Sequence, residues 1–182
     1  MALIDTTQMR QGTFVVLNGD PHVITAYQHV KPGKGGAFVR MRLKSLTSGA
    51  VLDRTIKSGE TMEAAEIQKR QMQYLYEAGD NVVLMDQQSF EQLEMPRAHI
   101  ENADLMAEQC EVEVLLHDGR PISVALPNFV VLEVTETDPP ERGGKQKPAT
   151  LETGAVVTVP AFVARGDKLR IDTRERAYVE RA

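Results

Sequence analysis

The sequence has no tryptophan, one cysteine and an aromatic content of only 5%. The single cysteine, Cys110, excludes an intramolecular disulfide, and the four histidines show no metal-ligand spacing, so we expect no bound metal. No stretch approaches the roughly 18 consecutive apolar residues of a membrane-spanning helix. The N-terminus also lacks the basic and apolar regions of a signal peptide. We therefore expect a cytoplasmic protein with no cofactor and no membrane partner.

Motifs of the common enzyme classes are missing as well. There is no Gly-x-Ser-x-Gly elbow, and no glycine-rich loop has the spacing of a phosphate-binding P-loop. A βαβ rhythm is absent, which argues against a nucleotide-binding α/β enzyme. Cys110 lies at the start of an expected strand and is interpreted as a core residue rather than a nucleophile. We expect no catalytic residues and no enzymatic activity. A hydrolase or transferase is the third alternative, which turnover of any small substrate would revive.

Charge is unevenly distributed along the 182 residues. The net charge is −5, which argues against nucleic acid binding because phosphate contacts need clustered Lys and Arg. Residues 1–64 nevertheless carry a net charge of +3, residues 65–127 a net charge of −8 and residues 128–182 a net charge of 0. Such a chain can touch a polyanion with its ends while its middle stays clear. The alternative is that the acidic middle serves only solubility.

Short strands joined by turns dominate the sequence. Asn18-Gly19 between two apolar runs predicts a hairpin, and a second hairpin is expected over residues 27–44. Residues 58–68 are expected to form a helical turn and linker, and residues 98–108 a short helix. Strands at this spacing predict an all-β protein of small barrels or sandwiches. The further strands are expected at residues 51–56, 73–76, 82–85, 111–116, 122–126, 129–134, 156–159 and 169–171.

The most unusual stretch is Lys31-Pro32-Gly33-Lys34-Gly35-Gly36. Pro32 fixes one backbone angle, whereas the glycines permit positive φ and remove side-chain bulk. A tight loop of this composition lifts the cation of Lys34 clear of the flanking strands. It suits a probe that enters a narrow polyanionic cavity. The alternative is an ordinary solvent-exposed turn, in which Gly, Pro and Lys are all common.

The strand after this loop, residues 37–44, alternates apolar and basic residues. Its period of two places Val39, Met41 and Leu43 inside and leaves a basic row outside. Charges two residues apart on a strand are separated by roughly 6.5–7 Å, close to the spacing of successive phosphates. The row is interpreted either as a nucleic-acid contact or as a merely solvated face. Its members are Arg40, Arg42 and Lys44.

A set of sequence blocks, in order along nearly the whole chain, resembles bacterial elongation factor P. Each block alone is weakly diagnostic, but together they are highly specific. The blocks are Lys31–Gly35 with Ala37–Arg40, Lys57–Glu60, Gln73–Tyr76, Met85-Asp86 with Phe90–Gln92, Pro121–Val124, Leu126–Val130, Val134–Pro139, Lys147–Gly154 and Asp172–Arg174.

The resemblance implies three small β-barrels in an L shape that imitates transfer RNA. An SH3-like (KOW-like) barrel would span residues 1–64, and OB-like barrels residues 65–127 and 128–182. It also implies a translation elongation factor that binds the 70S ribosome between the peptidyl and exit sites, with its first domain along the acceptor stem of the peptidyl-tRNA. Holding a poor substrate such as prolyl-tRNA in a reactive geometry lowers an entropic barrier without any catalytic group. The implied effect is stimulated peptide-bond formation and relief of stalling at consecutive prolines.

Lys34 matches the tip position of the family, which reaches toward the peptidyl-transferase centre. Lysine-modifying enzymes often extend this position, commonly with a β-lysyl group in the lysine-bearing branch. A monomer is the simplest state for a factor of this kind. The implied tRNA- and ribosome-binding residues are Lys31, Pro32, Gly33, Lys34, Gly35, Arg40, Arg42 and Lys44.

Two features depart from the family pattern. Residues 140–146 form a shorter loop than usual and lack a Gly-Asp-Thr segment, which puts contacts with the exit-site codon in doubt. The C-terminal block also lacks the usual Gly before its tyrosine. A divergent paralogue of the family exists, but residues 31–35 and 135–139 match the pattern of the main branch. The second alternative is a general OB-fold RNA-binding module, which predicts stacking aromatics on exposed strand faces.

Overall fold

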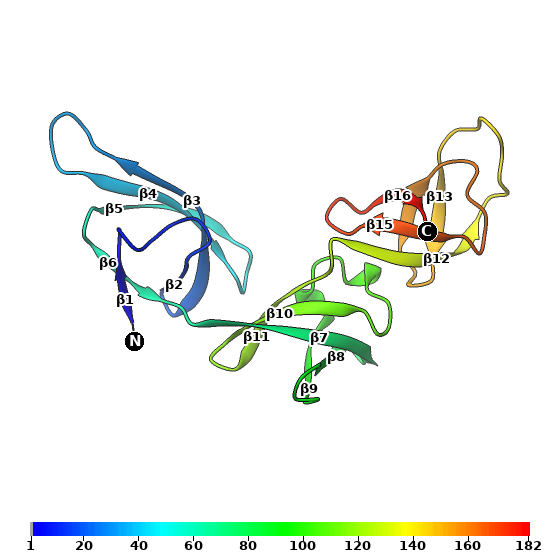
Figure 1. The fold of residues 1–182 in the computed structure, drawn as a ribbon, viewed down its shortest axis with the longest axis horizontal. Helices are drawn as coiled ribbons and strands as arrows, with labels where there is room; N and C mark the ends of the chain where they lie inside the picture. The colour runs from blue at the N-terminus through cyan, green and yellow to red at the C-terminus, as the bar shows by residue number, and fades with distance from the viewer. Residues whose placement is uncertain (1) are drawn as a thin grey trace. The chain divides into compact units, whose positions relative to one another are not determined.

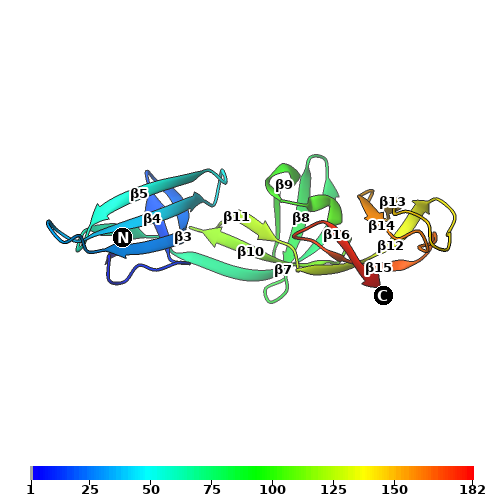
Figure 2. The same cartoon turned by 90° about the horizontal axis from the view of Figure 1, so that it is seen from above.

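The computed structural model describes residues 2–182 and consists almost entirely of strands. They form three sheets, ordered β1-β6-β2-β3-β4-β5, β11-β10-β7-β8-β9 and β14-β13-β12-β15-β16 (Figures 1 and 2). This confirms the all-β prediction. The elements are β1 (Leu3–Asp5), β2 (Phe14–Leu17), β3 (Asp20–Val30), β4 (Phe38–Ser45), β5 (Val51–Lys57), β6 (Thr61–Ala64), β7 (Ile67–Ala78), β8 (Asn81–Asp86), β9 (Gln92–Pro96), η1 (Arg97–His99), η2 (Ala103–Leu105), β10 (Glu111–His117), β11 (Arg120–Ala125), β12 (Phe129–Thr137), β13 (Lys147–Leu151), β14 (Val156–Val159), β15 (Lys168–Asp172) and β16 (Ala177–Arg181).

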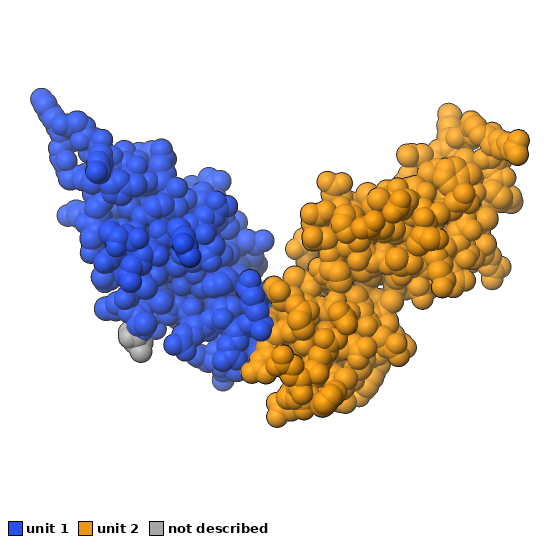
Figure 3. All heavy atoms as spheres, viewed as in Figure 1, with its two compact units in different colours: residues 1–69, 115–123 blue, residues 70–114, 124–182 orange. Residues whose placement is uncertain are grey.

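The chain divides into two compact units (Figure 3). Unit 1 comprises residues 1–69 and 115–123, and unit 2 comprises residues 70–114 and 124–182. The six-stranded sheet lies in unit 1 and the sheet of β12–β16 in unit 2, whereas β7, β10 and β11 of the middle sheet each contribute residues to both units. The three-domain division at residues 64 and 127 stays a prediction. Within residues 2–182, no helix has the length and apolarity needed to span a membrane.

The first hairpin forms as predicted. Asn18 and Gly19 both have positive φ, 53° and 78°, as the tight turns that join twisted antiparallel strands require. The strand after the Asn18-Gly19 turn and the first strand of the second hairpin, expected from residue 27, are one long strand, β3, with a bulge between Ile24 and Ala26. The bulge shifts the pairing register by one residue, so a simple alternation of polar and apolar positions fails there.

The helical turn expected over residues 58–68 is wrong. Residues 61–64 are the strand β6, and β7 begins at Ile67. β6 inserts between β1 and β2, with Met62 opposite Ile4 and Ala64 opposite Val15. Met62 is 9% exposed and packs in the core of unit 1. Pairing with two neighbouring strands therefore outweighs the helical propensity of the Met-Glu-Ala-Ala-Glu stretch.

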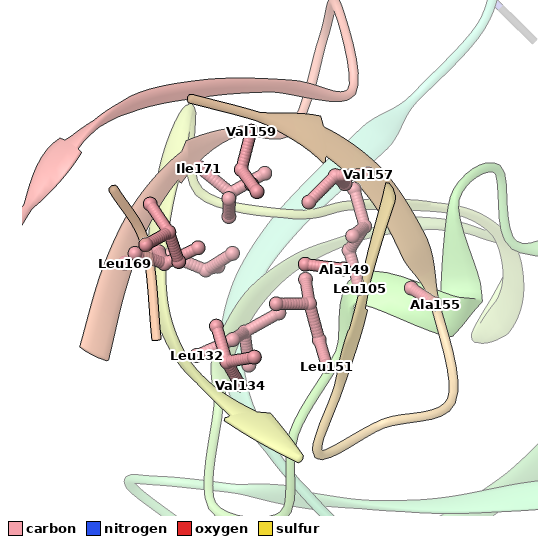
Figure 4. Close-up of a cluster of buried hydrophobic side chains, with 12 residues drawn as sticks. Leu105, Leu132, Val134, Ala149, Leu151, Ala155, Val157, Val159, Leu169 and Ile171 are labelled. Atoms are coloured by element: carbon pink, nitrogen blue, oxygen red, sulfur yellow. The ribbon is translucent and has the colours of Figure 1, made fainter. Parts of the chain in front are cut away.

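Unit 2 has a core in which a residue from the middle part of the chain packs among the C-terminal strands. Leu105, in η2, is fully buried in the cluster formed by β12–β15 (Figure 4). The short helix expected over residues 98–108 is instead two single 3₁₀ turns. Asn102 between them has a left-handed backbone (φ 59°), which a continuous helix cannot accommodate.

A polar connection accompanies this packing. Arg176, in the β15–β16 turn, donates to both carboxylate oxygens of Asp104 at 2.7 and 2.6 Å and to Asn102 Oδ1 at 3.0 Å. The Asn102 side chain in turn donates to the Thr173 carbonyl at 2.9 Å. The hydrogen bond from Arg176 lowers the pKa of Asp104, and the same bond raises the pKa of Arg176. Planar, two-point recognition of this kind fixes orientation as well as distance.

Arg176→Ala should loosen unit 2 selectively. We expect a loss of about 1 kcal/mol or less in the free energy of unfolding, because both side chains are 38% exposed and solvent screens the pair. Amide hydrogen exchange of β12–β16 measures the effect without mixing in unit 1. Arg165→Ala, which removes an exposed arginine that forms no ion pair within residues 2–182, is the control.

The loss of stability caused by Arg176→Ala should also depend on pH. Because the folded-state pKa of Asp104 lies below its ordinary value of 3.8, the pair contributes stability above that value and loses it as the pH falls through the folded pKa. The difference between wild type and Arg176→Ala should therefore shrink at acidic pH. A difference that persisted undiminished to pH 2 would contradict the pairing.

Candidate functional site

The candidate site begins with the loop between β3 and β4. The last cross-strand pair is Val30 with Phe38, and residues 31–36 beyond it are all exposed. Of the three glycines, Gly35 alone has positive φ, 101°. No atom lies within 4 Å of where a Cβ would stand on any of them, so the loop extends into open space. Figure 3 shows it as the narrow projection of unit 1.

The base of this loop is fixed by residues from elsewhere in unit 1. Ser58 donates its backbone N–H to the Ala37 carbonyl at 3.0 Å, and its hydroxyl lies 2.9 Å from Nε2 of His29. The Gly59 N–H donates to Thr6 Oγ1 at 2.9 Å, which fastens the β5–β6 turn in place. Lys34 is thus carried by a loop whose two ends are held, and its side chain forms no hydrogen bond or ion pair within residues 2–182.

β4 presents the predicted alternation. Val39 and Leu43 are fully buried and Met41 is 3% exposed, whereas the three basic residues between and after them are exposed. The pairing with β5 adds Lys57, which stands opposite Phe38 and is also exposed. The sequence prediction omits Lys57 because the strand expected there ends at residue 56, whereas β5 continues to Lys57. The alternation of Asp53, Thr55 and Lys57 was the available signal.

The arginines of the basic row differ in whether a carboxylate balances their charge. Arg42 Nε donates to Asp53 Oδ1 at 2.9 Å, across the β4–β5 register. This hydrogen bond raises the pKa of Arg42 and lowers that of Asp53. Arg40 instead has its guanidinium 5.4 Å from the ring centre of Phe38 and forms no ion pair within the described part of the chain. Arg40 therefore offers an uncompensated charge, whereas Asp53 balances that of Arg42.

A shallow hollow lies over the middle of this surface. Its volume is about 460 Å³, and Gln28, Arg40, Arg42, Asp53 and Thr55 contribute to its wall. These residues come from three adjacent strands, β3, β4 and β5. An open hollow with guanidinium groups on its wall is suited to a phosphate backbone rather than to an enclosed small molecule.

Features that would suggest an enzyme are weak within residues 2–182. No group of three or more His, Cys, Asp or Glu side chains in this range is placed to hold a metal ion. Cys110 is half-buried and packs against the C-terminal core, and burial raises the pKa of its thiol. A raised thiol pKa disfavours the nucleophilic thiolate. This agrees with the interpretation of Cys110 as a packing residue.

The loop between β12 and β13, which is shorter than in the family pattern, is closed at its base by a buried lysine. Residues 138–146 are exposed, but Lys147 at the end of the loop is only 8% exposed and donates from Nζ to the Asp138 carbonyl at 2.5 Å. Gly144 lies against Ala161, whose Cβ is 3.0 Å from where a Gly144 Cβ would stand. Lys147 thus closes the base of the loop, and its ammonium is not available to a partner.

Three family models together match almost the whole chain. They are the elongation factor P (EF-P) KOW-like domain over residues 5–62, the elongation factor P (EF-P) OB domain over residues 67–124, and the elongation factor P C-terminal domain over residues 130–181.

Curated relatives match over their full length. The elongation factor P of Moorella thermoacetica is 44% identical over 99% of this chain and 100% of its own. That of Pelotomaculum thermopropionicum is 46% identical over 98% and 100%.

Among solved structures, the eukaryotic translation initiation factor 5A from Methanococcus jannaschii is 26% identical, with a TM-score of 0.59 over 69% of this chain and 92% of its own. An initiation factor 5A family protein from Naegleria fowleri, 18% identical with a TM-score of 0.54 over 69% and 98%, shows a similar fold. With three family models in order and relatives of more than 40% identity over the full length, this chain belongs to the elongation factor P family of translation elongation factors.

Proposed function

We propose that this translation factor binds the ribosome between the peptidyl and exit tRNA sites as a cytoplasmic monomer. There it stimulates peptide-bond formation and relieves stalling at consecutive prolines. Its first barrel lies along the acceptor stem of the peptidyl-tRNA, and the loop of residues 31–36 reaches toward the peptidyl-transferase centre.

The observation that carries this proposal is the placement of Lys34. Its loop is fixed at both ends by Ala37, Ser58 and His29, and the tip has no ion pair with any residue from 2 to 182. A free ammonium at the end of a braced projection can enter a narrow cavity lined by phosphates. The same exposure leaves Nζ open to a lysine-modifying enzyme, which would lengthen the cationic arm.

The chemistry required of Lys34 is positioning rather than proton transfer. Peptidyl transfer to a poor nucleophile or from a poor donor is slow when the reactants seldom adopt the reactive geometry. A cation that holds the backbone of the peptidyl-tRNA end restricts the motion of the reacting groups. Part of the entropy loss needed to reach the transition state then occurs already on binding. No general base within the loop is needed, in agreement with its composition of Lys, Pro and Gly.

The basic row extends the contact along the acceptor stem. Arg40, Lys44 and Lys57 are exposed cations on the outward face of the same hairpin and its neighbour β5. Arg40 and Lys44 lie four residues apart on β4, about 13 Å or two phosphate spacings, and Lys57 lies on the adjacent strand β5. Arg42 contributes less, because Asp53 already balances its charge at 2.9 Å.

A general RNA-binding module is the second candidate, and one observation favours it. Phe129, on the outward face of β12, is 38% exposed, and the Arg170 guanidinium lies 4.3 Å from its ring centre. Exposed aromatics with arginines bind unpaired bases in OB folds. However, Arg170 is paired with Glu180 at 3.2 Å, which reduces its attraction for phosphate. Tight binding of free single-stranded RNA without ribosomes would favour this candidate over the first.

Lys34→Ala should abolish most of the stimulation. Loss of one charge-assisted contact of about 1.5–3 kcal/mol corresponds to a roughly 10–100-fold slower reaction. Synthesis of a consecutive-proline reporter in a strain depleted of the native factor measures this. Lys34→Arg, which keeps a charge but loses the ε-amine, should fail as well, whereas Lys168→Ala, an exposed lysine of β15, should complement fully. Complementation by Lys34→Ala would overturn the proposal.

The two arginines of β4 should differ in their effect on ribosome binding. Removing one phosphate contact lowers the slope of log affinity against log salt by about 0.7–0.9. We expect a change of that size for Arg40→Ala and a clearly smaller one for Arg42→Ala, since Asp53 compensates Arg42. Asp53→Asn should steepen the slope by freeing Arg42. Equal effects of the two arginine variants would show that the ion pair opens on binding.

The loop glycines provide a geometric test. Gly35→Ala places a Cβ on a residue with φ of 101°, which costs about 1–2 kcal/mol in the preferred loop shape. Because the loop is exposed, it should rearrange rather than unfold the barrel, so reporter activity should fall while the thermal midpoint stays unchanged. Gly33→Ala, at a residue without positive φ and with open space around it, is the matched control for backbone strain and should lose less activity than Gly35→Ala.

A further inference from the structure

The turn between β8 and β9 carries an aromatic side chain in an unfavourable setting. Phe90 is 68% exposed, more than any other large apolar side chain within residues 2–182. Its backbone is in the left-handed region, with φ of 61°. A bulky residue in this region is an outlier because its Cβ crowds the following carbonyl. The other non-glycine residues with positive φ are polar or charged: Asn18, Asn102, Gln109, Asp118 and Arg176.

A hydrogen-bonded turn holds Phe90 in this conformation. The carboxylate of Asp86, a residue only 4% exposed, accepts from the N–H groups of Gln88 at 2.7 Å and Ser89 at 3.1 Å. The Phe90 N–H donates to the Asp86 carbonyl at 2.9 Å, and Arg70 donates to the Asp86 carboxylate at 3.1 Å. The turn is therefore rigidly formed, and it directs an apolar ring into solvent.

The position would be better filled by another residue if folding alone were at stake. Glycine or asparagine adopts positive φ at little cost, and the exposed ring of Phe90 gains little from burial. Strained residues that the surrounding structure over-determines occur preferentially at binding and switching sites. Exposed aromatics are also the side chains that contribute most to protein interfaces. Both features of Phe90 thus point to a partner that covers the ring.

The surrounding charge indicates what kind of partner this is. Glu91 is exposed and follows Phe90 directly, and Glu111 lies beside Gln87 of the same turn at 3.2 Å; neither forms an ion pair within residues 2–182. The nearby cation, Arg70, is neutralised by Asp86 at 3.1 Å. Carboxylates repel phosphates, so RNA is a poor partner for this surface. A basic protein surface with an apolar pocket matches both the ring and the charge.

We propose that Phe90 and the carboxylates of Glu91 and Glu111 form a protein-docking surface, here termed the Phe90 surface. Its partner is a basic protein of the ribosome, whose apolar pocket receives the ring. This inference rests on the proposed function, because the proteins that coat ribosomal RNA are the basic surfaces an acidic segment would meet there. The charge of −8 on residues 65–127 then has a role beyond solubility. It steers this part of the chain toward protein and away from RNA.

Variants at this position separate binding from folding. Phe90→Gly removes both the ring and the backbone strain, so its thermal midpoint should equal or exceed that of wild type while its affinity for purified ribosomes falls roughly 10–100-fold. Phe90→Tyr keeps the ring and should bind like wild type. Unchanged affinity of Phe90→Gly would overturn the inference. A lowered thermal midpoint would also overturn it, because it would show that Phe90 serves the fold.

A photo-crosslink identifies the partner class. The full chain with p-benzoylphenylalanine at position 90 is bound to ribosomes purified from the native host, irradiated, and digested separately with nuclease and protease. We expect a protease-sensitive adduct to a basic ribosomal protein, and no such adduct with the crosslinker at Val156, which is 57% exposed in unit 2. Co-sedimentation with only an RNA adduct, or with none, would overturn the inference alone. Failure of the unsubstituted chain to co-sediment would overturn the proposed function as well.

Discussion

The antiparallel pairing of β3 with β4 is the interaction on which the candidate site depends. It runs from His22 opposite Ser45 to Val30 opposite Phe38, so the two strands leave the core of unit 1 as one ladder. Its period of two sends Val39, Met41 and Leu43 into the core and the basic residues outward. A slip of one residue would bury Arg40 and Arg42 and expose the core residues. The register that stabilises the barrel therefore also fixes the cationic surface and the position of the loop at its end.

Unit 2 is organised by a different kind of contact. Leu105 and the Asn102–Asp104–Arg176 network join residues of the middle part of the chain to the C-terminal strands. The apolar contact gives this association most of its free energy, because burial of leucine exceeds what a half-exposed ion pair contributes. The ion pair contributes direction, since its two parallel hydrogen bonds allow one orientation of the β15–β16 turn. The two contributions are separable, because the side chains involved are different.

The sequence predicted the strands that pair locally and missed those that depend on distant neighbours. The Asn18-Gly19 hairpin and β4 follow from turn chemistry and alternation, which are properties of a few adjacent residues. By contrast, β6 exists because β1 and β2 flank it, and nothing within residues 61–64 indicates those partners. The loop around Lys34 was predictable from its composition, but the balance of Arg42 by Asp53 was not, since it depends on the β4–β5 register. The position of Phe90 in the left-handed region was equally hidden, because phenylalanine rarely adopts it.

The fixed base of the Lys34 loop and the charge segregation of the chain both reduce the entropy that binding must offset. Binding must offset the entropy of ordering the groups that make contact. By fixing Ala37 through Ser58, the fold confines that loss to the few residues at the tip. Under the proposed function, the charge segregation would act earlier, since RNA attracts the basic first segment and repels the acidic middle one, and so favours one orientation of approach before any contact forms. A chain of uniform charge with the same loop would meet RNA in many unproductive orientations. Under the proposed function, the placement of charge would therefore contribute to RNA recognition together with Lys34.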